Sequence, residues 1–557
     1  MIPLRLAREL TYQLDKAGEH ERLARALANV PVFLVLNKGE GQSDYLILWQ
    51  KLSAKAVESE PYFRTSLAGL RSSGSSLLPD ALSAAGGFFV TRCADETATE
   101  FCTELLVWAE ARNDETRAMK MHRGIGIVLD RTRDYDAAMT HFAESLRLAE
   151  SLGDKSGIAL AIGSMGLAHE EQHRYAEAME CYERQLTMAQ ALGDKSQIAD
   201  ATINMGSVHS YQGRNVEAME CFERGLAIAE SIGHKKWMSN ALICMGNLHF
   251  EQGRHVEAMV CFERTLAMDE ALGDKRGVAG AINCMGFVHL SQGRYAEAME
   301  CFERSLAMDK TLGDKRGMAN IITCMGIVHH SQGRYTEAKE CFGRSLAMGE
   351  AIGDKHGMAA AVGNMGDVHL NQGRYAEALQ KYREALDGHR AIGVLNGMTY
   401  WHDGIARTLL ETADSLSPDE RIVSLREARE NAQECVRISE EIGNPDMLFL
   451  GRITLARLDA AEGNAALATE KLETMLAEAT DEEHIADLHY WLWKINSGMG
   501  TRSPEPILKM YEALYARIPK FEFLKRIAEL KGERVPMSAD DLEIPPPFQG
   551  GGQGVVA

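Results

Sequence analysis

The sequence predicts an all-α protein built as a solenoid of antiparallel helix pairs. The first observation behind this prediction is a forty-residue unit that recurs six times between Gly153 and Ile392 without slippage. The second is that each unit holds two proline-free stretches whose small and apolar residues recur three and four positions apart, which is helical spacing. The third is a short turn between the two stretches. Such a helix pair buries both of its faces only when neighbouring pairs stack on it.

Three short marks define the unit. Gly-Asp-Lys opens it at Gly153, a Met-Gly pair follows at Met165, and Gln-His-Arg, written Gln-Gly-Arg in the later units, follows in turn. Glycine adopts the left-handed conformation that ends a helix, and the next aspartate caps the following helix. We therefore expect a first helix from Ile158 to about Glu171 and a second helix from about Tyr175 to Leu192.

The unit resembles the tetratricopeptide repeat (TPR). Gly166 matches the small residue where the two helices of that repeat cross, Ala178 matches the small residue of the second helix, and an aromatic residue matches its packing ring, at Tyr182, Phe222, Phe262, Phe302 and Phe342. The period is forty instead of the usual thirty-four, as in the kinesin-light-chain and nephrocystin-like forms. The tyrosine usual late in the first helix is histidine here, at His169, His209, His249, His289, His329 and His369. The resemblance implies a right-handed superhelix whose first helices line the concave surface.

The remaining chain extends this array at both ends. We expect a helical N-terminal region at 1–112, a degenerate first TPR at 113–152, six clear TPRs at 153–392, and degenerate TPR-like hairpins with a C-terminal capping helix at 393–532. Solenoid ends need such polar caps. Residues 533–557 hold three consecutive prolines and a glycine run, which predicts a disordered tail.

The N-terminal region also resembles, loosely, a helical connector of nephrocystin-like and other STAND-type NTPases. The resemblance rests on the run from Glu9 to Gly18, on Leu23-Ala24, and on Leu46 to Leu52. An ordinary N-terminal helical cap is the alternative interpretation of the same residues.

Composition excludes several classes of function. The net charge of −20 and the isoelectric point near 5.4 argue against nucleic acid and anionic membranes as partners. No apolar run approaches the length that spans a bilayer, and the N-terminus lacks a basic-then-apolar signal pattern. Five of the eleven cysteines hold one position in successive units, too far apart for disulfides. We therefore expect a reduced, cytoplasmic protein.

The repeats differ mainly along one stripe of the first helix. Its positions lie three and four apart, on the side that the resemblance places toward the concave groove. The stripe carries carboxamides, which both donate to and accept from a peptide backbone, and apolar side chains that suit anchoring. The predicted partner-binding residues are Asn204, Ser207, Tyr211, Asn240, Asn247, Phe250, Asn283, Phe287, Leu290, Asn320, Ile327, His330, Asn364 and Asp367. Unselected drift of solvent-exposed positions is the alternative.

Acidic groups exceed basic ones along this stripe, which favours a partner segment that is both apolar and basic. The first functional hypothesis is a non-enzymatic scaffold that binds a peptide or helix of another protein in the groove. The second is a sensor or regulatory subunit of a STAND-type signalling system whose NTPase is on another chain. The sequence leaves homo-oligomerisation open.

The sequence gives only weak signals for a catalytic, metal-binding or nucleotide-binding site. The histidine column invites a metal hypothesis, but equivalent positions lie a full repeat apart, beyond shared ligation. The sequence has no phosphate-binding Gly-x-x-x-x-Gly-Lys-Ser/Thr loop and no Gly-x-Ser-x-Gly elbow. We therefore expect no catalytic residues, no metal and no cofactor. An enzyme would need a site in 1–112 or beyond 440.

In the third clear unit, His234 replaces the capping aspartate and Trp237 stands where four other units have glycine.

Overall fold

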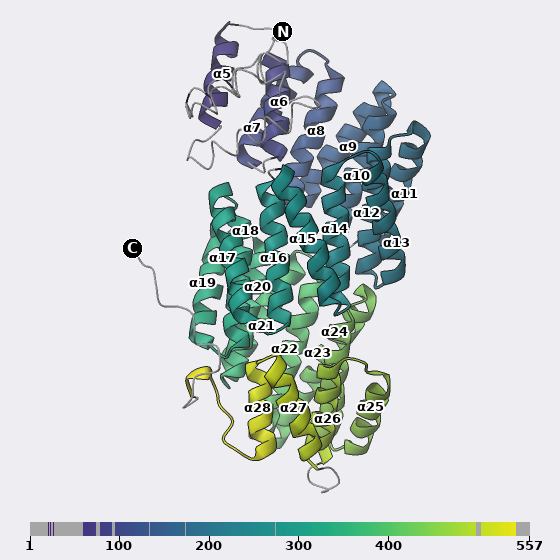
Figure 1. Cartoon of the computed structure of the whole chain (residues 1–557). Helices are drawn as coiled ribbons and strands as arrows, with labels where there is room; N and C mark the ends of the chain where they lie inside the picture. Colours follow the sequence, from purple (N-terminus) through teal and green to yellow (C-terminus); the bar gives the residue numbers. More distant parts are fainter. Residues whose placement is uncertain are drawn as a thin grey trace. The chain divides into compact units, whose positions relative to one another are not determined.

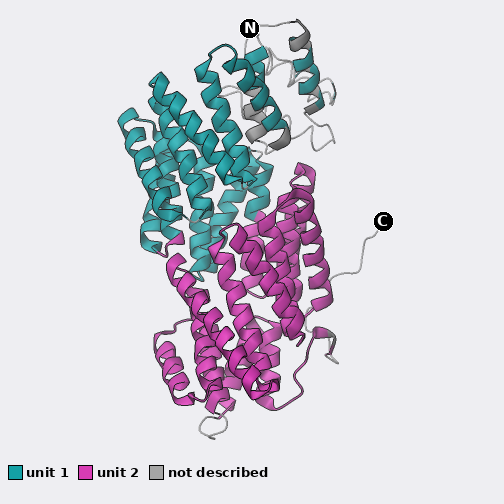
Figure 2. Cartoon of the chain, turned by 180° about the vertical axis from the view of Figure 1, so that it is seen from behind, with its two compact units in different colours: residues 1–210, 214–281 teal, residues 211–213, 282–557 magenta. Residues whose placement is uncertain are grey.

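The computed structural model describes residues 21, 23, 26, 60–73, 78–91, 95–132, 134–172, 174–272, 274–496 and 503–541. The chain divides into two compact units, shown in different colours in Figure 2. Unit 1 comprises residues 1–210 and 214–281, and unit 2 comprises residues 211–213 and 282–557. The described residues form helices and turns and contain no strand. The predicted all-α class is therefore confirmed.

The helices follow one another in antiparallel pairs that stack along each unit (Figure 1). The first helices of the pairs are α8 Glu115–Arg131, α10 Lys155–Glu171, α12 Lys195–Tyr211, α14 Lys235–Glu251, α16 Lys275–Ser291, α18 Lys315–Ser331, α20 Lys355–Asn371 and α22 Leu395–Thr412. The second helices are α9 Tyr135–Leu152, α11 Tyr175–Leu192, α13 Asn215–Ser231, α15 His255–Leu272, α17 Tyr295–Leu312, α19 Tyr335–Ile352, α21 Tyr375–Ala391 and α23 Pro418–Ile442.

The Gly-Asp mark ends one helix and begins the next. Gly153 adopts φ 64° after α9, and the carboxylate of Asp154 accepts a hydrogen bond from the Gly157 amide at 3.0 Å. This left-handed C-terminal residue and aspartate N-cap satisfy backbone groups that both helix ends would otherwise leave unpaired. His234 serves the same purpose, since its Nδ1 accepts from the Trp237 amide at 3.4 Å.

The two helices of a pair pack closely because a glycine faces a ring. A Cβ atom added to Gly166 would lie 2.6 Å from the Tyr182 ring, and one added to Gly326 would lie 2.5 Å from the Phe342 ring. Tyr182 and Phe342 are almost completely buried. The crossing glycine and packing aromatic expected from the sequence are thus both present in the structure.

Unit 1 begins with three helices before the first pair, α5 Glu60–Ser73, α6 Leu78–Thr91 and α7 Asp95–Glu110. They share one apolar core with α8 and α9, which includes Phe63, Leu82, Phe101 and Leu105. The residues that resemble a STAND-type connector, 9–18 and 46–52, lie outside the described residues.

Unit 2 ends with α24 Pro445–Ala461, α25 Ala465–Glu478, α26 Glu482–Asn496, α27 Glu505–Arg517 and α28 Phe521–Lys531. Their core includes Leu472, Tyr490, Tyr511 and Phe523. A short 3-10 helix precedes α23 at Ala413–Ser415, and another lies at Ala539–Asp541. The predicted disordered tail at 533–557 stays a prediction: residues 533–541 are described and end in this short 3-10 helix, and the rest lies outside the described residues. In the part of the chain that the structure describes, no helix is both long and apolar enough to cross a membrane.

Candidate functional site

All fourteen predicted partner-binding residues lie on first helices, from α12 to α20. None of them is fully buried. Tyr211, Asn247 and Asn320 are exposed, and the other eleven are half-buried. These side chains therefore remain accessible on the first helices. The structure describes the two units separately, so their parts of the stripe are considered in turn.

In unit 2 the apolar members of the stripe also contribute to packing. The Phe287 ring meets the Phe302 ring edge-on, with 5.6 Å between centroids, and Leu290 packs against the same cluster. Ile327 packs against the cluster of Tyr335 and Phe342 on the neighbouring second helix. A position that varies between repeats can therefore serve both binding and packing. One part of each of these side chains supports the core, and the other part stays accessible.

In unit 1 one polar member of the stripe, Asn204, lies beside Asp200 on α12. Its carboxylate accepts hydrogen bonds from Gln185 Nε2 at 3.1 Å and from Asn204 Nδ2 at 3.3 Å. Burial raises the pKa of Asp200, while these hydrogen bonds and the charges of Lys236 and Arg123 oppose the increase. The arrangement places a carboxylate and a carboxamide on the same helix, where both can meet the backbone of a bound segment.

Two repeats have a tyrosine at the packing aromatic and a carboxylate on the first helix. Tyr182 donates to Glu170 at 2.6 Å, and Tyr382 donates to Asp367 at 2.7 Å. The repeats between them have phenylalanine at this position and need no acceptor. The buried hydroxyl explains why a carboxylate is present, since an unsatisfied buried donor is costly. Asp367 therefore supports the fold as well as belonging to the stripe.

The structure extends the stripe to residues that the sequence prediction missed. Arg407 on α22 and Arg457 on α24 each lie fourteen positions after a repeat-opening glycine, Gly393 and Gly443, as Phe287 and Ile327 lie fourteen after theirs. Arg457 pairs with Glu411 at 2.5 Å and lies 3.8 Å from the centre of a Trp491 ring. Counting from the glycine would have found both arginines, although the surrounding repeats are degenerate.

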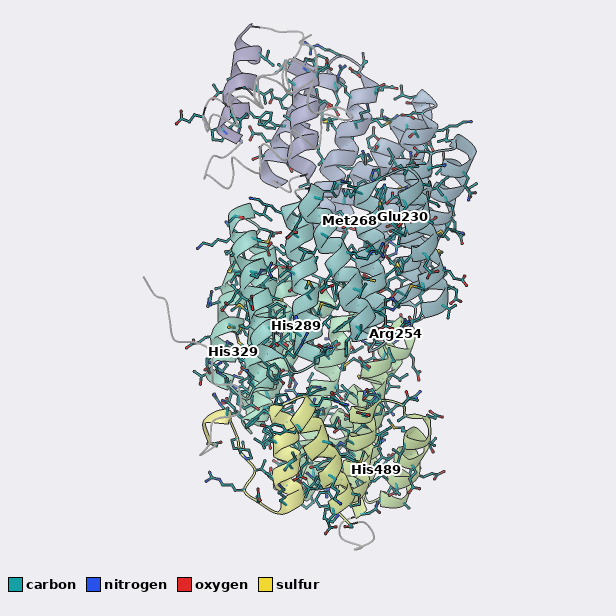
Figure 3. All side chains as sticks on the ribbon, in the orientation of Figure 1. Glu230, Arg254, Met268, His289, His329 and His489 are labelled. Atoms are coloured by element: carbon teal, nitrogen blue, oxygen red, sulfur yellow. The ribbon has the colours of Figure 1, made fainter. Side chains whose placement is uncertain are left out.

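The histidine column packs within the helices. His169, His249 and His369 are buried, and Figure 3 labels two further members, His289 and His329, on neighbouring first helices. Burial lowers the pKa of each histidine in this column, and the arginine of the following turn lowers it further. Within the described residues, no three histidine, cysteine or acidic side chains gather in a way that could hold a metal ion.

Cys284 on α16 and Cys324 on α18 are not poised for nucleophilic chemistry. Burial raises the pKa of Cys284 to about 11 and of Cys324 to about 12. Reactive thiols instead lie in electropositive surroundings that lower the pKa. Every cysteine in the described part of the chain is a free thiol.

Comparison with solved structures finds several helical proteins of low similarity. A Rap protein complexed with competence and sporulation factor shares 13% identity, with a TM-score of 0.43 over 71% of this chain and 99% of that chain. The quorum sensor NprR from B. thuringiensis in its apo form shares 13% identity, with a TM-score of 0.42 over 63% and 98%. BtubC from P. vanneervenii shares 18% identity, with a TM-score of 0.34 over 39% and 92%. Scores this low support no transfer of function.

A search of curated proteins found no significant match. A family model described as a tetratricopeptide repeat matches the sequence four times, at residues 116–191, 157–231, 237–316 and 317–391. These residues span α8 to α21, the same helices in which a glycine faces a buried ring and a Gly-Asp mark joins one pair to the next. The chain therefore belongs to the tetratricopeptide-repeat proteins.

Proposed function

We propose that this protein is a non-enzymatic scaffold that binds a peptide or helical segment of another protein along its first helices. The observation that carries the proposal is the partial exposure of all fourteen stripe residues. A face that only packed would be sealed between helices, and a face free of selection would drift toward polar residues. Instead, Phe250, Phe287 and Leu290 stay apolar and accessible beside carboxamides.

The chemistry of the stripe supports a partner segment that carries both apolar and polar side chains. Exposed Asn247 and Asn320 can pair with backbone groups of a bound segment, and half-buried Phe287 offers a surface for an apolar side chain. Acidic groups such as Asp200 favour basic residues in the partner. The stripe therefore suits recognition of a segment with alternating apolar and basic side chains.

A quantitative pull-down tests this function. The full-length chain is immobilised as wild type, as Phe287→Ala/Leu290→Ala, and as Asn247→Ala/Asn320→Ala, whose exposed side chains can be removed without disturbing the core. The matched control is Val256→Ala/Val260→Ala on α15, where the valines are 72% and 50% exposed on a second helix. We expect both stripe variants to lose partner recovery by at least about fivefold.

The control should recover partners as the wild type does. Circular dichroism confirms that each variant is folded before its binding is compared. Equal recovery of every partner by the wild type, the control and both stripe variants would refute the proposal.

A further inference from the structure

The C-terminal helix α28 packs against the C-terminal ends of α18 and α20 in unit 2, where the stripe ends on each helix. Phe521, its first residue, is 4% exposed and belongs to the same apolar cluster as Ile327 and Tyr335. The Phe521 ring meets the Tyr335 ring edge-on, with 6.0 Å between centroids. It also fills the space beside Gly333, where an added Cβ atom would lie 2.5 Å from the ring. An aromatic side chain of the C-terminus thus occupies a pocket at the turn of this repeat.

A lysine one helical turn later makes the polar half of the contact. Lys525 Nζ donates to the backbone oxygen of Asn371 at 3.1 Å, and Asn371 is the last residue of α20. The carbonyl end of a helix favours a cation. Asn371 in turn lies 2.9 Å from the ring of His330, one of the predicted partner-binding residues. Lys525 therefore binds the C-terminal end of α20, beside the predicted partner-binding residue His330.

The acidic residue between them faces the basic groups of the same surface. Burial would raise the pKa of Glu522, but the charges of Arg526, Lys525, Arg407 and His330 hold it below its usual value. Arg407 belongs to the extended stripe on α22. Glu522 is itself exposed, with 50% of its side chain accessible, so α28 keeps an acidic group in solvent beside these basic groups.

The residues after α28 close over the same turn. The Ala539 amide donates to the Gly333 carbonyl at 3.1 Å, and Asp541 accepts from the amides of Met537 and Ser538 at 2.7 and 2.9 Å. Ala539 is 8% exposed and joins the cluster that holds Phe521. Helix α28 and this strap, residues 518–541, act together as one covering segment.

We propose that the covering segment is an internal occupant of a partner-binding surface, defined by Ile327, His330, Tyr335 and Asn371. The partner that fits this surface is an amphipathic helix with an aromatic residue and, four positions later, a lysine. Such a helix takes the place of α28 on the surface. This inference rests on the proposed scaffold function and adds the chemistry of the partner to it. The apolar and basic character expected of the partner is the character of the segment bound there.

A peptide added in trans tests the proposal without a natural partner. The probe is a fluorescein-labelled synthetic peptide of residues 518–533, and its binding is measured by fluorescence anisotropy. It is titrated into the full-length wild type and into full-length Phe521→Ala/Lys525→Ala, whose own α28 has lost both anchoring side chains. An internal occupant lowers the apparent affinity by the fraction of molecules in which the surface is free. We expect the variant to bind the probe at least about tenfold more tightly than the wild type.

The control probe is the same peptide carrying both substitutions, which should bind neither protein. Hydrogen exchange should show protection by the wild-type peptide at the C-terminal ends of α18 and α20. Equal binding to both proteins, binding to neither, or protection elsewhere would overturn the proposal. Full-length Lys525→Ala, which keeps the buried Phe521, answers the same question if the double variant does not fold.

The two proposals fail separately. The peptide measurement uses no partner protein, and the pull-down uses variants of Asn247, Phe287, Leu290 and Asn320 that do not touch α28. Loss of partner recovery with no peptide binding would leave the scaffold function standing without the internal occupant. Peptide binding with unchanged partner recovery would support the internal occupant and refute binding by the stripe residues that were changed.

Discussion

At the scale of residues, the identity of one aromatic decides which neighbours a repeat needs. Tyrosine at the packing position places a hydroxyl among apolar groups, and Glu170 or Asp367 accepts its hydrogen bond. The sequence predicted the packing role of the ring from its spacing. It could not predict the acceptor, since Glu170 lies twelve positions before its tyrosine and Asp367 lies fifteen before its own. The geometry of the pair, and not a fixed spacing, selects the carboxylate.

Glu170 makes the stability of unit 1 depend on pH. Burial raises its pKa to about 7 from the ordinary value of 4.5, against the hydrogen bond from Tyr182, and the nearby charges of Glu171 and Asp130 add to the increase. The protonated form is thus favoured on folding, so this contribution is complete below pH 4.5 and is lost as the pH rises through 7. Glu170→Gln keeps an acceptor for Tyr182 without the charge. We expect it to stabilise the protein by roughly 2 kcal/mol at pH 8 and to change little at pH 4.5.

Thermal and urea unfolding followed by circular dichroism at both pH values measure this difference. The exposed neighbour provides the control, because Glu171→Gln should stay within about 0.5 kcal/mol of wild type at either pH. A gain for Glu170→Gln that is the same at pH 4.5 and pH 8 would contradict the assignment.

At the scale of elements, a glycine near the start of a first helix faces a larger side chain of the preceding second helix at three repeat boundaries. A Cβ atom at Gly277 would lie 2.3 Å from Asp269, one at Gly317 would lie 2.4 Å from Asp309, and one at Gly397 would lie 1.9 Å from His389. Where the second helix has a small residue instead, Ala229, the next first helix has Trp237. Trp237 is half-buried and donates from Nε1 to Ser196 Oγ at 3.1 Å. At this boundary the large side chain is therefore on the first helix and not on the second.

This matching predicts opposite effects for two glycine substitutions. Gly397→Ala should destabilise the protein by about 1–3 kcal/mol, because His389 is 1% exposed and held by the Trp401 indole at 2.9 Å, so its ring cannot move aside. Gly280→Ala, inside α16 with nothing within 4 Å of the added methyl group, should stabilise by about 0.5–1 kcal/mol. Urea unfolding of both variants gives the comparison. Destabilisation by Gly280→Ala, or none by Gly397→Ala, would show that the matching has been misread.

The helix ends could be predicted well from the sequence. The sizes of the side chains that meet at a repeat boundary could be predicted only in part. The Gly-Asp mark located the end of α9 and the N-cap of α10, because capping needs only local residues, although α10 begins at Lys155 and not at the expected Ile158. The pairing of Asp309 with Gly317 joins two helices across a repeat boundary. A single copy of the repeat could not show it, because the two residues belong to different copies.

At the scale of the whole molecule, the repeat period predicts contacts between neighbours and no others. It therefore predicted the stacked pairs and the position of the stripe on the first helices. It could not predict the covering segment, because Lys525 and Asn371 are 154 positions apart and residues 518–541 carry no repeat mark. Ile327 and His330 stay half-buried beside this segment, so the prediction that they bind a partner remains a prediction.

The stacking of each helix pair on its neighbours predicts that the chain tolerates the removal of one complete repeat from unit 1. Deleting residues 153–192 joins Leu152 to Gly193, and Gly193 adopts φ 68° after its helix as Gly153 adopts φ 64° after α9. The new junction therefore reproduces an existing helix end, and the neighbouring pairs can stack again. We expect a folded protein with unchanged helical content per residue and a cooperative unfolding transition, measured by circular dichroism.

Deleting residues 153–172 instead removes one helix and leaves α11 without its partner. Ala178 and Tyr182, both completely buried, would lose the helix that covers them, at about 2–3 kcal/mol for the large side chain alone. The shorter deletion should therefore unfold at a lower temperature than the longer one, although it removes half as many residues. Equal stability of the two deletion variants would mean that the helix pair is not the unit of folding in this solenoid.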